Sequence, residues 1–335
     1  MSLFAMRHIR LMLPCPPPTS ERAWGDYYFA RSLAEALNRL GVWTQLHFAA
    51  HKAPARMRNR IRLRQLFTRP GGVDLVIRGR VPYAPARRRP LFMWLISSPD
   101  NVTDEELAGV EHIFVASRSF CKSLQERGYS ASFLPQCTDP RLFNEDRKDP
   151  ALHSEVLFVG NRRDYAPREV VEEIAEAGLP LAVWGRGWQA CLPDTVYRGL
   201  HIPNDELGQY YASANVVLND HTSDMYNEGF VSNRVFDVLA SGSKLVTEEM
   251  ADLPEIAVPH IFAYEQGGAL DAVRRALAAP AEKMPGLAAQ IRQDWSFDAR
   301  AETLVSDIFG ARAPRRITQG TVGPSGRASP TTKEI

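Results

Sequence analysis

The feature that most constrains this chain is an alternation of short apolar runs and helical patterns, which continues along almost its whole length. Because this order is typical of stacked βαβ units, we expect an α/β protein with parallel sheets. The expected strands of a first series are 9–15, 42–48, 73–79, 91–97, 112–117 and 131–135, with a helix over about 27–40. A second series has expected strands at 155–160, 180–185, 194–199, 214–220 and 243–248, with helices near 167–177, 205–213 and 232–241.

A polar, proline-containing segment, residues 137–154, separates the two series and is expected to contain the hinge between two domains. The chain has 335 residues, 44% of them hydrophobic, which is enough for two cores of ordinary size. Residues 311–335 are rich in Pro, Gly, Ser, Thr and Arg and nearly lack apolar side chains, so we predict a disordered tail there.

The cysteines and the apolar runs indicate the compartment. Four cysteines, none of them in a C-x-x-C pair, favour reduced thiols in a cytosolic protein over disulfides or a zinc site. The longest strongly apolar run, residues 91–96, is too short to span a bilayer, and the first residues lack the apolar stretch of a secretory signal. We therefore expect a soluble, cytoplasmic protein.

Residues 52–89 form a basic block, with twelve Lys or Arg against the single acidic residue Asp74. Arg58, Arg62 and Arg64 belong to a stretch in which apolar residues approximate one helical face. A solvated helix explains this pattern, and so does a surface that meets anionic lipid or an acidic glycan acceptor. No stacking aromatics are interleaved with the arginines, which makes nucleic acid the least favoured partner.

Two loops of the second series follow expected strands, where ligands of parallel α/β sheets bind. The first is Gly160-Asn161-Arg162-Arg163, in which a small residue permits close backbone approach and guanidiniums suit a pyrophosphate. The second, residues 185–188, offers Gly185 and the aromatic plane of Trp188 near a base. Each also has a plain structural explanation, as turn glycines, solvated arginines and a packed tryptophan.

A third loop leads into the helix expected at 232–241, where Ser232 is a plausible N-cap. Glu228 precedes this helix, and Asp237 lies within it, on the side away from its apolar stripe. The two carboxylates can accept hydrogen bonds from sugar or ribose hydroxyls, and Arg234 can reach a phosphate. Taken singly, Glu228 and Asp237 are more typical of surface carboxylates, and it is their order among the other motifs that indicates a site.

The order of these motifs resembles a known family. The sequence from Gly-Asn-Arg through "VWGRGW" and "YRGLHIPNDELGQYYASANVVLND" to "NEGFVSNRVFDVLASGSKLVT" and "LPEI" is similar to the donor half of GT-B glycosyltransferases of the group 1 (family four) type. This part of the sequence is especially similar to the CgeB-like branch of that family. The run "HIFVASRSFCKSLQERGYSASFLPQCTDPRLF" and the ending "DWSFDARAETLVSDIF" resemble that family's inner strands and last helix.

The resemblance implies a GT-B fold, in which two Rossmann-like domains face each other across a cleft. It implies an acceptor-side domain over 1–145 and a donor domain over 146–294, followed by a crossing helix at 295–310 and the tail at 311–335. The donor is then a nucleotide-sugar, with Glu228 on the transferred sugar and Asp237 on the ribose. The sequence departs from the family pattern because its second acid is Asp and the spacing is one residue longer. Donor-binding residues carried over with it are Gly160, Asn161, Arg162, Gly185, Trp188, Ser232, Asn233 and Arg234.

In the first domain the resemblance singles out two acids. Asp26, just before the first helix, is either a helix cap or the catalytic base. Asp100, with Ser98, ends an inner strand where the family carries a residue that touches the reacting sugar; a simple turn is the alternative. The catalytic candidates are therefore Glu228, Asp26 and Asp100.

The function implied is glycosyl transfer to a glycan, lipid-linked or other acceptor in cell-surface polysaccharide or glycoconjugate assembly, with retained configuration. The chain contains no D-x-D pair, so we expect neither a metal nor another cofactor. One alternative is a GT-B-fold nucleotide-sugar epimerase; another is a non-catalytic protein that binds nucleotide-sugars or nucleic acid. The basic block adds an expected peripheral association with the inner membrane face.

Overall fold

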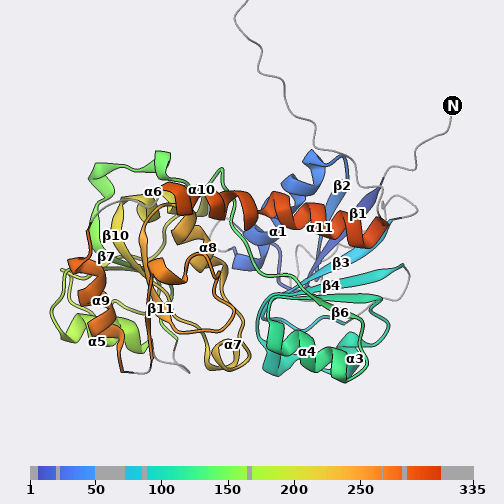
Figure 1. Ribbon diagram of the computed structural model, residues 1–335, viewed down its shortest axis with the longest axis horizontal. Coiled ribbons are helices and arrows are strands. Elements are labelled where there is room, and N and C mark those ends of the chain that lie inside the picture. Colours follow the sequence, from blue (N-terminus) through green and yellow to red (C-terminus); the bar gives the residue numbers. More distant parts are fainter. Residues whose placement is uncertain are drawn as a thin grey trace, which may run out of the picture.

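The computed structural model describes residues 7–19, 23–49, 72–84, 89–163, 168–265, 267–280 and 285–310, which form two lobes (Figure 1). The first lobe is built on a six-stranded sheet of order β2-β1-β3-β4-β5-β6, in which every pair of strands is parallel. Its strands are β1 (His8–Leu13), β2 (Trp43–Phe48), β3 (Val73–Arg78), β4 (Leu91–Leu95), β5 (His112–Val115) and β6 (Ala131–Phe133).

The second lobe repeats this plan with a six-stranded parallel sheet of order β12-β11-β10-β7-β8-β9. Its strands are β7 (Ser154–Val159), β8 (Leu181–Trp184), β9 (Tyr197–Gly199), β10 (Ala214–Leu218), β11 (Lys244–Glu248) and β12 (Ile261–Tyr264). The two sheets fall on either side of the proline-containing segment expected to hold the hinge. The α/β class and the parallel sheets predicted from the sequence are confirmed.

Helices cover the two sheets. Those of the first lobe are α1 (Gly25–Arg39), η2 (Pro99–Asn101), α3 (Asp104–Leu107) and α4 (Arg118–Glu126). Those of the linker and second lobe are η3 (Glu145–Arg147), η4 (Pro150–Leu152), α5 (Glu169–Glu176), α6 (Asn204–Ser213), α7 (Ser223–Asn227), α8 (Asn233–Ala240), η5 (Val258–His260), α9 (Ala269–Ala278) and α10 (Pro285–Asp294). The last helix, α11 (Phe297–Phe309), crosses to the first lobe and lies along α1 (Figure 1).

The chain passes between the lobes twice, and the two passages meet. Thr138, on the way out, forms an isolated parallel bridge with Ser296, on the way back. The amide of Thr138 donates to the carbonyl of Trp295, and the amide of Phe297 donates to the carbonyl of Thr138. Beyond this crossing, Phe297 and Leu304 of α11 are buried in the core of the first lobe. The hinge therefore consists of two chain segments hydrogen-bonded to each other, rather than of one linker.

The structure differs from the sequence expectations at several elements. The strand β12 and the helices α9 and α10 are not among the elements expected from the sequence. A helical period is present in α9, where Ala269, Ala272, Val273 and Ala276 are buried at i, i+3, i+4 and i+7. Asp237 was expected on the side of α8 away from its apolar stripe; it is only 4% exposed, because the linker covers that side as well. The tail at 311–335 lies outside the described residues, as do residues 52–71 and 85–88 of the basic block.

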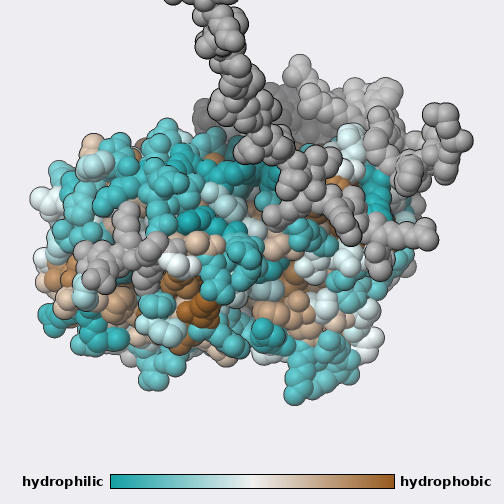
Figure 2. Space-filling view, turned by 45° about the horizontal axis from the view of Figure 1, so that its top comes forward, coloured by the Kyte–Doolittle hydropathy of each residue, from teal (hydrophilic) through white to brown (hydrophobic). Residues whose placement is uncertain are grey.

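Hydrophilic side chains cover most of the surface seen in Figure 2, and its hydrophobic patches lie in the lower half of that view. All four cysteines are free thiols, and only Cys191 is exposed. Among the described helices, none is long and apolar enough to cross a membrane.

Candidate active site between the two domains

A cavity of about 220 Å³ lies where the two lobes face each other. Its walls come from α1, the linker, the end of β7 and the helices α6, α8 and α11. The predicted donor residues Asn233, Arg234 and Asp237 line it from the second domain. From the first domain it is lined by Gly25, Tyr28, Phe29 and Ser32.

Three guanidiniums gather around one carboxylate at the carboxyl ends of β7 and β10. Arg168 donates to Asp220 in a contact buried on both sides, and Arg163 and Arg234 lie 3.6 and 3.9 Å from the same carboxylate. Phe158 lies beneath, with the guanidiniums of Arg168 and Arg234 at 4.9 and 5.2 Å from its ring centre. Three positive charges and one negative charge leave the cluster cationic.

Arg168 is buried among other positive charges, and its pKa reflects this. Burial lowers the pKa of Arg168 to about 10, and the neighbouring Arg234 and Arg163 act in the same direction, whereas Asp220 opposes them. The guanidinium still carries its proton at neutral pH. A buried group of like charges is relieved by an incoming anion, so the cluster suits a phosphate or diphosphate.

Asp237 lies on the neighbouring wall of the cavity. Its Oδ1 accepts a hydrogen bond from Thr138 Oγ1 at 2.7 Å, and its Oδ2 accepts one from Asn233 Nδ2 at 3.0 Å. Burial raises the pKa of Asp237 well above its ordinary value; Thr138 opposes this and Asp139 adds to it. The predicted ribose acid is thus bonded to the hinge that joins the two domains.

Glu228 follows α7, in the loop that leads to α8. Its carbonyl oxygen accepts hydrogen bonds from the hydroxyls of Ser117 and Ser119 at the start of α4, in the first domain. Gly229 comes next with φ +75°, a backbone conformation that strains any other residue, and a Cβ there would lie 3.2 Å from Ser119 Oγ. This loop lies between the two domains, and no described side-chain contact ties the Glu228 carboxylate to either of them.

The loops after β7 and β8 pack tightly on each other. A Cβ at Gly185, whose φ is +148°, would collide with the carbonyl oxygen of Gly160. Asn161 accepts the amide of Arg186 through Oδ1 at 2.9 Å and Arg168 Nε through its carbonyl at 2.7 Å. These residues shape the backbone beside the cationic cluster.

Two predicted donor residues are placed differently from the expectation. Trp188 is fully buried, and its Nε1 donates to the carbonyl of Gly160, so its ring cannot stack on a base. Arg162 does not line the cavity; it lies 3.8 Å from Glu172 of α5, while Arg163 turns toward Asp220. Because neighbouring residues of this loop point to opposite sides, Arg163 rather than Arg162 belongs to the cationic cluster.

On the first-domain side, Asp26 stands at the start of α1 over the loop that follows β3. A Cβ at Gly79 would lie 2.5 Å from both carboxylate oxygens of Asp26. Among the described residues its Oδ2 is buried without a hydrogen-bond partner. Burial raises the pKa of Asp26 to about 6, against the opposing effects of backbone hydrogen bonding and Arg78. Such an acid exchanges its proton near neutral pH, as a catalytic group must.

Asp26 does not act as a helix cap, because α1 begins at Gly25 and Trp24 takes the N-cap position. Its charge also reaches Cys15 at the end of β1: burial, with help from Asp26, raises the pKa of Cys15 to about 12. The thiol therefore stays protonated beside the carboxylate, and Cys15 is no nucleophile.

Asp100 lies in η2, exposed, one turn from a strained residue. Ser98 has φ 55° and ψ 57°, the only non-glycine residue with positive φ among those described. Such strain is concentrated at functional sites. The fully buried Arg78 holds this corner by donating to the carbonyl of Asn101 at 3.0 Å and to Glu106 at 2.7 Å.

Sequence reasoning missed a buried network beside the cationic cluster. His221 Nε2 accepts the amide of Ser232, the N-cap of α8, at 3.1 Å, and its Nδ1 lies 2.9 Å from Glu248. The ring is therefore neutral, with its proton on Nδ1. Ser232 Oγ donates to Asn219 Oδ1 at 3.0 Å, and Arg234 Nη1 lies 3.4 Å from the same oxygen. The network sets the start of α8 and the placement of Arg234.

A substitution can test this network. His221→Phe leaves the amide of Ser232 without its acceptor and removes the ring from Glu248, which keeps the amide of residue 221 and the hydroxyl of Thr247. At 1–3 kcal/mol for a buried group left unpaired, we expect the free energy of unfolding to fall by roughly 2 kcal/mol. Urea denaturation measures it. His153→Phe is the control, because His153 is 45% exposed and should cost less than ~1 kcal/mol. Equal losses in the two variants would contradict the structural role of His221.

The signal for Asp220 and His221 is present in the sequence, since Asp220 ends the expected strand 214–220 and His221 directly follows it, at the carboxyl end of the sheet. A larger hollow, about 790 Å³, lies elsewhere, beside the beginnings of β7 and β8. It is open to solvent, and Arg198 is the one Lys or Arg among its described lining residues. The interdomain cavity is the better candidate, because its arginine, Arg234, belongs to the cationic cluster and stands beside Asp237. No group of His, Cys, Asp and Glu among the described residues is arranged to hold a metal ion.

Comparisons with known proteins agree with this geometry. A family model described as glycosyl transferase-like matches residues 162–306, which include the cationic cluster and Asp237. No curated protein sequence matches the chain. Among solved structures, a glycosyltransferase involved in avilamycin A biosynthesis superposes with a TM-score of 0.60 at 18% identity, covering 89% of this chain and 96% of that one.

Trehalose-phosphate synthases are similar as well. The UDP-forming enzyme from Burkholderia vietnamiensis has a TM-score of 0.59 at 16% identity, covering 91% of this chain and 97% of its own. The E. coli enzyme bound to UDP-2-fluoro glucose has a TM-score of 0.58 at 12% identity, covering 91% and 100%. At these identities the likeness concerns the fold, and the fold is GT-B: two parallel six-stranded sheets with helices, as expected from the sequence.

Proposed function

We propose that this protein is a GT-B glycosyltransferase that moves a sugar from a nucleoside diphosphate to an acceptor hydroxyl. The observation that carries the proposal is the cluster of Arg163, Arg168 and Arg234 around the single carboxylate Asp220. Arg234 brings this cluster to the wall of the interdomain cavity, which Asp237 also lines. A cationic pocket beside a buried acid fits a diphosphate and a ribose diol. The glycosyl transferase-like match over 162–306 supports the same assignment.

The chemistry follows from where charge develops. As the bond from sugar to diphosphate breaks, negative charge grows on the departing phosphate, and guanidiniums already in place stabilise it without reorganising. The three arginines meet that need, so the reaction as we propose it requires no divalent ion. Activity in the presence of EDTA would support this part, and dependence on added Mg²⁺ would contradict it.

We further propose that the sugar keeps its anomeric configuration. In a retaining transfer the acceptor attacks on the face that the diphosphate leaves, and the departing diphosphate collects the acceptor proton. Asp26 then orients the acceptor hydroxyl from the first domain, and Glu228 and Asp100 contact the transferred sugar. Inversion would instead make Asp26 the general base. The anomeric signal of the product in an NMR spectrum distinguishes the two courses.

The proposed acceptor is a glycan or lipid-linked sugar in the assembly of a cell-surface polysaccharide or glycoconjugate. The support is the basic block, which suits anionic lipid or an acidic glycan at the inner membrane face. Reversing the charges of Arg58, Arg62 and Arg64 should weaken binding to anionic vesicles or to an acidic acceptor, with strong salt dependence. Unchanged binding to both would remove this role.

Turnover tests the proposed function directly. Purified protein is incubated with nucleotide-sugars, with and without candidate acceptors, and nucleoside diphosphate release is measured. Release that depends on the acceptor supports a transferase. Release without any acceptor dependence would point to hydrolysis or epimerisation, and binding without release would point to a non-catalytic nucleotide-sugar protein.

Asp237→Ala tests the ribose contact. Removing a carboxylate that accepts two ribose hydroxyls should weaken nucleoside diphosphate binding by ten- to a hundredfold, as measured by calorimetry, since each lost hydrogen bond costs about 1 kcal/mol. Thr138→Val is the matched control, because it removes the hinge partner of Asp237 and leaves the carboxylate. An equal loss in the two variants would show that the hinge, rather than the ribose contact, governs affinity.

A further inference from the structure

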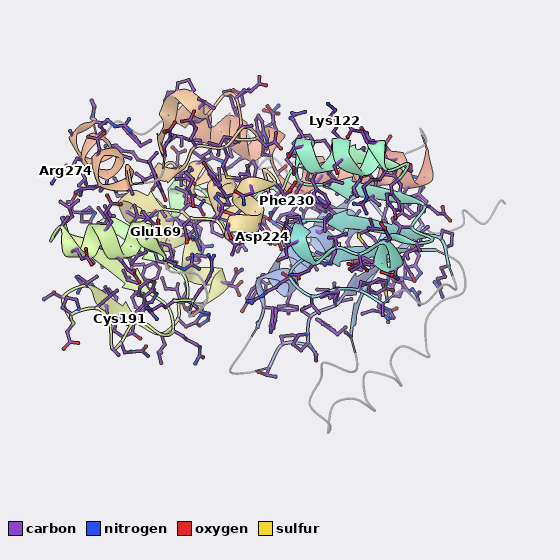
Figure 3. All side chains as sticks on the ribbon, turned by 90° about the horizontal axis from the view of Figure 1, so that it is seen from below. Lys122, Glu169, Cys191, Asp224, Phe230 and Arg274 are labelled. Carbon is purple, nitrogen blue, oxygen red and sulfur yellow. The ribbon has the colours of Figure 1, made fainter. Side chains whose placement is uncertain are left out.

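A side chain of the second domain is buried in the core of the first. Phe230, in the loop between α7 and α8, is 0% exposed and belongs to the hydrophobic cluster formed by β4, β5 and α4 of the first domain. Its ring meets that of Phe120 edge-on, with 5.6 Å between the ring centres. Met225 of α7 packs on the same cluster. Figure 3 labels Phe230 and Asp224, and both lie where the two domains meet.

Polar contacts surround this anchor. Ser119 Oγ donates to the carbonyl of Glu228 at 2.9 Å, and Ser117 Oγ donates to the same oxygen while accepting the amide of Phe120. On the other side, the amide of Arg118 donates to Asp252 of the second domain at 2.6 Å. The start of α4 therefore bonds to two loops of the donor domain, the one that carries Phe230 and the one that carries Asp252.

The anchored residue lies between two parts of the candidate site. Glu228, two positions earlier, is a predicted contact of the transferred sugar; Ser232, two positions later, is held by His221 in the second domain. Residues 229–231 are thus tied at one end to the first domain and at the other to the second.

We propose that Phe230 is a positioning residue, which holds the donor-side loop against the first domain so that Glu228 takes its place only when the two domains are docked. This inference rests on the proposed function. If the inference holds, the donor pocket requires both domains, because the first domain contributes Ser117, Ser119 and Phe120 to the support of the loop.

The test compares Phe230→Ala with Phe230→Leu and with Phe114→Ala. Phe114 is an equally buried phenylalanine on the opposite face of the first sheet, so its loss creates a similar cavity without touching the loop. Hydrogen exchange of residues 223–232 and the donor KM and kcat are measured for each variant. For Phe230→Ala we expect at least tenfold faster exchange in this segment and at least a fivefold rise in donor KM, with both largely restored in Phe230→Leu.

Two results would overturn the proposal: exchange of residues 223–232 that does not change in Phe230→Ala, or one that rises equally in Phe114→Ala. If Phe230→Ala does not fold, Ser119→Ala removes one bond to Glu228 and should raise donor KM at least twofold; an unchanged KM contradicts the anchor. If the wild-type protein turns over no nucleotide-sugar, the proposed function fails, and the exchange measurements still decide whether Phe230 holds the loop.

Discussion

Asp26→Asn is expected to lower kcat by at least a hundredfold while making the folded protein more stable at alkaline pH. The loss follows because Asp26 is proposed to orient the acceptor hydroxyl, and a misplacement of a reacting group by about 1 Å can cost 10²-fold. In the wild-type enzyme the same group should give kcat/KM an acidic limb near pH 6, where burial places its pKa. The variant should lack that limb, which a pH profile of its residual activity measures.

The gain in stability has a definite sign. The pKa of Asp26 is about 6 in the folded protein and 3.8 in its ordinary environment, so folding favours the protonated form. Stability from this group is complete below pH 3.8 and is lost as pH rises to about 6, a difference of roughly 3 kcal/mol at 1.36 kcal/mol per pKa unit. Asparagine avoids that loss, so the variant should exceed the wild type by up to ~3 kcal/mol at pH 8 and match it near pH 4.

Asp104→Asn serves as the control. Hydrogen bonds from Tyr129 and Arg127 lower the pKa of Asp104, so its contribution is present at neutral pH and is lost as pH falls. Its replacement should bring no gain at pH 8 and leave kcat within twofold of the wild type. If Asp26→Asn instead loses stability at pH 8, or retains full activity, Asp26 is a structural residue.

Arg234→Met carries the second large effect. Methionine keeps apolar contact with Phe158 and removes the guanidinium that bonds the carbonyl of Val159 at 2.7 Å. Loss of one preorganised donor to a departing oxyanion costs about 10²–10³ in kcat, and we expect that range for this variant. Steady-state kinetics at saturating donor measure it.

The matched variant is Arg198→Met. Arg198 lines the larger hollow, beside the beginnings of β7 and β8 and away from the cationic cluster. The activity of the Arg198→Met variant should therefore stay within twofold of the wild type. A comparable loss in both variants would mean that the larger hollow contributes to catalysis, and the assignment of the diphosphate to the interdomain cavity would be wrong.

Much of the architecture could be predicted because parallel strands carry their signal locally. Apolar runs such as 73–79 and 155–160 predict buried strands on their own, and the helix from Asn233 to Ala240 follows from its N-cap and apolar face. The candidate site could be predicted only in part from the sequence. Arg234 and Asp237 line one cavity, as the order of motifs suggested, because both are on one helix and share its start.

The remainder depends on contacts between distant residues. Whether Arg162 or Arg163 turns toward Asp220 is decided by how the loop packs under Trp188, and no local pattern encodes it. The burial of Asp237 requires Thr138 from the hinge, ninety-nine positions away. Phe230 reads as an ordinary apolar residue before a helix, and only the docking of two domains reveals where its ring goes.

A crystal structure with a bound nucleoside diphosphate tests the central claim most directly. The account predicts one molecule per chain, with its diphosphate among Arg163, Arg168 and Arg234 and its ribose hydroxyls on Asp237. A nucleotide bound in the larger hollow lined by Trp184 and Arg198, or an interdomain cavity that stays empty at millimolar nucleotide, would contradict it.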